Sequence, residues 1–170
     1  MTQDLFSTNH TIYWPELYEP VASFLVGGEN SDKMFRSNAE LLLFAASVGL
    51  RQGVREKSVG EKKEVDLDII LRLRNDFRDA GTYIFIIALL SCDKTDLEML
   101  RGTEAEKECV RIFSEYVCGG LKIIFELYQS AGPLSPYLFV EEIASGRSFA
   151  GGSEGNSTSG SEEEPITFFD

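Results

Sequence analysis

The chain contains 170 residues, of which 43% are hydrophobic, and its formal net charge is −12 at pH 7. This length predicts one domain with a sizeable core, and the hydrophobic content excludes a wholly disordered chain. The negative charge excludes general attraction to nucleic acid or anionic membranes, so any such contact requires a local basic patch. No apolar run approaches the ~18 residues that span a bilayer, and the N-terminus lacks the apolar segment of a signal peptide. We therefore expect a cytoplasmic protein that does not bind membranes.

The N-terminal part of the chain is predicted to form one helix after a loose terminus at residues 1–11. Tyr13-Trp14-Pro15 is predicted to begin this helix, because proline is tolerated in a first helical turn. An apolar face continues to Leu25, and Pro20 is expected to kink it. Gly27-Gly28 is expected to end it.

A second and more apolar helix is predicted from Ser37 or Asn38, either of which can cap its first turn. Apolar residues then recur at helical spacing in one stripe along the helix: Leu41, Phe44, Ala45 and Val48. Gly49 and Gly53 are expected to end the helix, because glycine leaves the helical conformation without steric cost. The chain then becomes basic, which predicts either an anchored loop that presents charge or an ordinary solvated loop.

The most highly charged part of the chain is residues 51–78, with eight basic and six acidic side chains. Its basic residues are candidates for binding a partner protein or nucleic acid: Arg51, Arg55, Lys57, Lys62 and Lys63. Because acids are interleaved with them, an internally paired charged surface is an equal alternative. Residues 65–73 fit either a short strand or a helical turn, and their periodicity leaves both open.

The second half of the chain is predicted to be helical throughout. Residues 83–90 are apolar on nearly all sides, as in a central core helix. A long helix follows from Thr103, with Gly119-Gly120 in its middle, and a last short helix covers residues 136–144. Two adjacent glycines cost roughly 2 kcal/mol of helix stability relative to alanine. Either another backbone packs closely at this point or the helix bends.

These elements predict a mostly all-α protein with a single compact domain over residues 12–145 and a flexible acidic tail over 146–170. Residues rich in glycine and serine cannot bury enough apolar surface to stay ordered. The tail ends in an acidic run and three apolar side chains that fit a groove on a partner: Ile166, Phe168 and Phe169. This layout is similar to the tails of bacterial single-strand DNA-binding proteins. A tail that only solubilises the protein, or that folds back on its own domain, remains an alternative.

No residues suggest catalysis, a cofactor or a metal, so we expect a protein that is not an enzyme. The single histidine, His10, lies in the expected loose terminus, and Cys118 has no evident base to activate it. Cys109 and Cys118 lack the second ligand pair of a zinc site. With Cys92, they make an odd number of cysteines without a disulfide spacing, which predicts reduced thiols that pack in the core.

Three segments resemble the family known as DNA phosphorothioation-associated protein 4 (dnd system-associated protein 4). The first contains Leu41 to Ala46, followed by Gly49, Gly53 and Arg55, and the second is the apolar helix at 83–90. The third runs from Ile112 to Leu121 and includes Gly119-Gly120. Together they span residues 35–127, whereas residues 63–74 and the tail have no counterpart in the resemblance.

The resemblance implies a bacterial cytoplasmic protein encoded beside DNA sulfur-modification and restriction genes, with a role in defence against phage. It implies no catalytic residues. The leading hypothesis is a non-enzymatic accessory subunit that binds a larger protein of such a system through its tail, its basic turn or both. Alternatives are a DNA-binding regulator that uses residues 51–78, which the overall charge does not favour, an acidic DNA mimic or inhibitor and, last, a hydrolase. The oligomeric state stays open.

Overall fold

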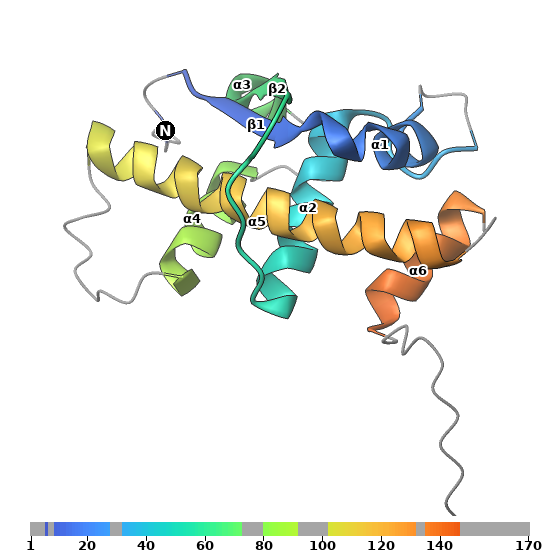
Figure 1. Cartoon of the computed structure of the whole chain (residues 1–170). Helices are drawn as coiled ribbons and strands as arrows, with labels where there is room; N and C mark the ends of the chain where they lie inside the picture. Colours follow the sequence, from blue (N-terminus) through green and yellow to red (C-terminus); the bar gives the residue numbers. More distant parts are fainter. Residues whose placement is uncertain are drawn as a thin grey trace, which may run out of the picture.

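The computed structural model describes residues 6, 9–27, 32–72, 80–91, 102–131 and 135–146. In this part of the chain the protein is mostly helical, as predicted, with one small antiparallel sheet (Figure 1). The elements in chain order are β1 (Thr11–Pro15), η1 (Glu16–Tyr18), α1 (Glu19–Leu25), α2 (Asn38–Gln52), β2 (Lys62–Asp66), α3 (Leu67–Leu71), α4 (Ala80–Ser91), α5 (Thr103–Ala131) and α6 (Pro136–Ser145). The predicted tail beyond Gly146, including Ile166, Phe168 and Phe169, lies outside the described residues.

The centre of the fold is the crossing of α2 and α5, which Figure 1 shows near the middle of the molecule. Ser37 caps α2, and its Oγ accepts the N–H of Glu40 at 3.4 Å. A Cβ on Gly120 of α5 would lie 1.8 Å from the carbonyl oxygen of Ala45, and one on Gly49 would lie 2.3 Å from that of Tyr116. The two helices therefore meet backbone to backbone, as one of the two explanations for the double glycine predicts.

Gly119, the other half of the double glycine, faces a second backbone. A Cβ there would lie 2.1 Å from the carbonyl oxygen of Val54. This contact exists because α2 ends at Gly53, whose left-handed φ of 67° turns the chain back across α5. The prediction that Gly53 ends the helix is confirmed. The same prediction for Gly49 is wrong, because Gly49 lies inside α2 and serves the helix crossing.

The sheet corrects the helix start predicted at residues 13–15. These residues belong to β1, which pairs with β2 in antiparallel register, with Trp14 opposite Lys63. Ile12 and Trp14 are buried, whereas Tyr13 between them is 45% exposed, so the strand alternates between core and solvent. The helical turns begin only after Pro15. Residues 65–71 contain both structures that the sequence left open, because β2 ends at Asp66 and α3 follows immediately.

The core is one continuous cluster of apolar side chains around the α2–α5 crossing. Trp14, Phe113 and Phe139 are its largest fully buried members. Phe6, within the terminus that we expected to be loose, is also buried against this cluster. In the described segments, no helix has both the length and the apolar character that crossing a bilayer requires.

Candidate functional site

The segment between α2 and β2 (residues 53–61, called the connector below) lies across α5 and is anchored to it. The N–H of Glu56 donates to the carbonyl of Glu115 at 3.0 Å. The guanidinium of Arg55 bonds the Glu115 carboxylate at 2.7 Å and lies over the ring of Tyr116, 5.4 Å from its centroid. These contacts agree with an anchored loop, one of the two alternatives that the sequence left open.

Three further ion pairs involve side chains of α5 beside the connector. Lys122 of α5 pairs with Glu56, and this hydrogen bond raises the pKa of Lys122. Arg111 pairs with both Glu108 and Glu115 on its own helix. Its hydrogen bond with Glu108 raises the pKa of Arg111 and lowers that of Glu108. The carboxylates of Glu56, Glu108 and Glu115 are therefore already engaged by basic side chains.

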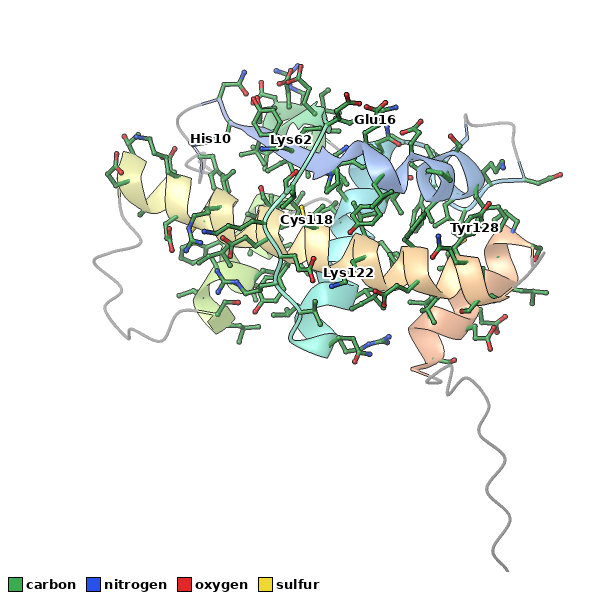
Figure 2. All side chains as sticks on the ribbon, viewed as in Figure 1. His10, Glu16, Lys62, Cys118, Lys122 and Tyr128 are labelled. Carbon is green, nitrogen blue, oxygen red and sulfur yellow. The ribbon has the colours of Figure 1, made fainter. Side chains whose placement is uncertain are left out.

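The connector, β1, β2 and α5 enclose a surface pocket of about 390 Å³. Figure 2 shows His10, Lys62 and Cys118 on this side of the molecule, where the strands pass α5. Four basic side chains line the pocket, two from the connector and β2 and two from α5: Lys57, Lys62, Lys107 and Arg111.

The pocket carries positive charge that its own acids do not balance. Its two carboxylates, Glu56 and Glu115, are paired with Lys122 and with two arginines, respectively. Lys57 and Lys62 form no ion pair with any residue that the structure describes, and both are exposed. In a chain of net charge −12, this pocket is a local site where an anion is attracted.

Cys118 lines the inner side of the pocket, and its Sγ lies 3.8 Å from the carbonyl oxygen of Tyr13, to which it donates. Burial raises the pKa of this thiol to about 12, and the carboxylates of Glu56 and Glu115 add to the shift. Lys62 and the Ser58 hydroxyl, which can donate to a thiolate, oppose the shift only in part. Cys118 is therefore protonated at neutral pH and a poor nucleophile.

Three of the five basic residues predicted to bind a partner or nucleic acid are occupied within the chain. Arg51 donates to the carbonyls of Ile143 and Ala144 at the end of α6, at 2.6 and 3.0 Å. Arg55 pairs with Glu115, as described above. Lys63 pairs with Glu19 at 2.7 Å. Only the remaining two, Lys57 and Lys62, come together at the pocket.

Sequence reasoning missed the contribution of α5 to this site. Lys107 and Arg111 are four residues apart, a spacing that places both on one face of a helix. That spacing was a usable signal, but it does not show which part of the chain faces this side of α5. Within the described segments, no group of three or more histidine, cysteine or acidic side chains is placed to hold a metal ion.

The fold and the pocket define a small, mostly helical protein with a basic surface pocket on one side of its longest helix. The chain matches the family model described as DNA sulphur modification system-associated protein 4 over residues 15–140. The chain therefore belongs to this family, which confirms the resemblance found in the sequence and extends it in both directions. Neither curated proteins nor solved structures give a significant match.

The family match includes the connector and all four basic pocket residues, and it ends before the predicted tail. The family's description associates it with a DNA sulphur modification system, and the chain shares that association.

Proposed function

We propose that this protein is a non-enzymatic accessory subunit of a bacterial DNA modification and restriction system linked to phosphorothioation. In this role it binds a larger protein subunit of that system. Membership of the family supports the association with such a system. The protonated state of Cys118 also favours a binding role, because the thiol in the pocket is not activated for attack.

The observation that carries the proposal is the contact between Arg51 and the end of α6. Arg51 is the penultimate residue of α2, and its guanidinium bonds the carbonyls of Ile143 and Ala144. The chain leaves α6 at Gly146, so the start of the predicted tail is held beside the start of the connector. The C-terminal ends of α2 and α6 therefore lie together, which supports a partner that contacts both the connector and the chain that follows α6.

Affinity purification from the native cells, followed by mass spectrometry, tests this role. Three tagged proteins are compared: the full chain, a chain that ends at Ser145, and a full chain with Lys57→Glu and Lys62→Glu. The matched control is a full chain with Lys33→Glu and Arg36→Glu, which reverses two charges before α2, at the opposite end of that helix from the connector.

We expect a modification or restriction subunit to copurify with the full chain and with the control. Loss of this subunit from the truncated chain identifies the tail as the docking element, and loss from the Lys57 and Lys62 variant identifies the connector. If no subunit of such a system copurifies with the full chain, the accessory role is refuted.

A further inference from the structure

We propose that the pocket formed by the connector, β2 and α5 binds the phosphate group of a nucleotide or of a nucleic-acid strand. The proposal concerns a phosphate-bearing ligand and not a protein, so it does not depend on the protein partner proposed above. It starts from Lys57 and Lys62, which line the pocket from two different segments. Neither has a carboxylate partner among the described residues, although acids are abundant in this chain.

Arg111 supplies a more rigid donor on the α5 side of the pocket. Its Nε and Nη2 bond the two carboxylate oxygens of Glu108, and its Nη1 bonds Glu115. A guanidinium has five N–H donors, so two remain for a ligand. Because two carboxylates already fix its plane, little conformational entropy is lost when it binds phosphate. Lys107, one helical turn away, also lines the pocket, where it is paired with Glu104 at 2.7 Å.

Ser58 provides an independent indication that the pocket is built for a polar ligand. It belongs to the pocket and its Oγ is buried, and apart from the Cys118 thiol, a weak acceptor, no described residue offers it a hydrogen-bond partner. Buried hydroxyl groups in folded proteins are nearly always hydrogen-bonded, so a hydroxyl with only a thiol beside it is available to a stronger acceptor. A phosphate oxygen is an acceptor that a hydroxyl in this position can satisfy.

The size of the pocket and one aromatic residue favour a nucleotide unit over a bare anion. A volume of about 390 Å³ lies within the range of small-molecule sites. Tyr13 also belongs to the pocket and is 45% exposed. Bases stack on exposed aromatic rings in sequence-independent single-strand binding, while basic side chains follow the phosphates. Lysines and an arginine beside an exposed tyrosine reproduce that combination.

The test measures binding by the full chain to three probes: inorganic phosphate, a mononucleotide and a short fluorescent single strand. Calorimetry suits the first two probes, and fluorescence anisotropy suits the third. The key variant carries Lys57→Gln and Lys62→Gln. Its matched control, Lys33→Gln with Arg36→Gln, removes the same charge outside the pocket. All four side chains lie on exposed residues, and an unchanged melting temperature verifies that each variant is folded.

We expect the pocket variant to lose about tenfold in affinity, because two cation–phosphate contacts are removed. The control should change less than about twofold, as an exposed charge outside the site does. For the single strand, the slope of log K against log salt should fall by about 1.4, since each phosphate contact contributes about 0.7. A Tyr13→Leu variant should weaken the mononucleotide and the strand but leave inorganic phosphate unchanged.

The three probes also distinguish the source of the phosphate. Equal affinity for the mononucleotide and the strand identifies a free nucleotide, whereas binding of the strand alone identifies a nucleic-acid backbone. Either result supports the proposed site if the Lys57→Gln and Lys62→Gln variant loses more affinity than the control variant does. The proposal is overturned if none of the three probes binds, or if the pocket and control variants lose affinity equally.

Discussion

Substituting Gly120 with alanine tests the backbone-to-backbone crossing of α2 and α5. A Cβ at this position would lie 1.8 Å from the Ala45 carbonyl oxygen and 3.0 Å from the Gly49 nitrogen. Both are main-chain atoms of α2, so the clash is not relieved by rotation of a side chain. Relief requires the two central helices to separate, and the apolar side chains around the crossing lose contact when they do.

The size of this effect follows from two opposing terms. Alanine is favoured over glycine in a helix by about 1 kcal/mol. Overpacking a core costs about 1–3 kcal/mol, and a clash with main-chain atoms belongs at the upper end. We therefore expect Gly120→Ala to lower the free energy of unfolding by about 2 kcal/mol and the melting temperature by about 4–8 °C for a domain of this size.

Urea and thermal denaturation, both followed by circular dichroism, measure this loss. Gln129→Ala is the control, because it introduces alanine at an exposed position of the same helix, where nothing is overpacked. That variant should match or slightly exceed the parent in stability. If Gly120→Ala proves as stable as the parent, α2 and α5 do not meet through their backbones, and the explanation of the double glycine is wrong.

Three further predictions each concern one residue: Gly119, Arg51 and Cys118. Gly119→Ala should destabilise less than Gly120→Ala, because its clash at 2.1 Å is with Val54 of the connector, and it should weaken ligand binding at the pocket instead. Arg51→Gln removes two hydrogen bonds to the end of α6 and should cost about 1–2 kcal/mol, visible as faster hydrogen exchange of the α6 amides. Burial raises the Cys118 pKa from about 9 to about 12, so between these values the folded protein holds a proton that the unfolded chain releases. The free energy of unfolding should therefore fall as pH rises above about 9. Cys118→Ser should make this fall smaller.

The elements that could be predicted from sequence are those determined by neighbouring residues. Ser37 caps α2 because its hydroxyl reaches an amide three residues away, and an apolar stripe at helical spacing marks the buried face. Gly53 ends the helix through its own φ angle. The double glycine predicted either a close backbone contact or a bend, because glycine is unfavourable inside a helix without such a reason.

The features that could not be predicted depend on residues far apart in the chain. Tyr13-Trp14-Pro15 becomes a strand through pairing with residues about 50 positions later, and no local pattern specifies that partner. Arg51 is separated by 92 residues from the carbonyl of Ile143 that it bonds. A basic side chain has the same sequence signature whether it pairs internally or faces a ligand. Only the folded structure shows that Arg51, Arg55 and Lys63 have partners within the chain, whereas Lys57 and Lys62 line the pocket.

The two faces of α5 connect the stability of the core to the geometry of the pocket. Gly120 packs against the backbone of α2, and Gly119, the preceding residue, packs against the backbone of the connector. Glu115, one turn earlier, binds the connector through Arg55 and also orients Arg111 in the pocket. A change on either side of this helix therefore moves a wall of the pocket. This arrangement explains why the connector is held by several contacts, although its own side chains contribute little to the core: its position determines where Lys57 lies relative to Lys62 and Arg111.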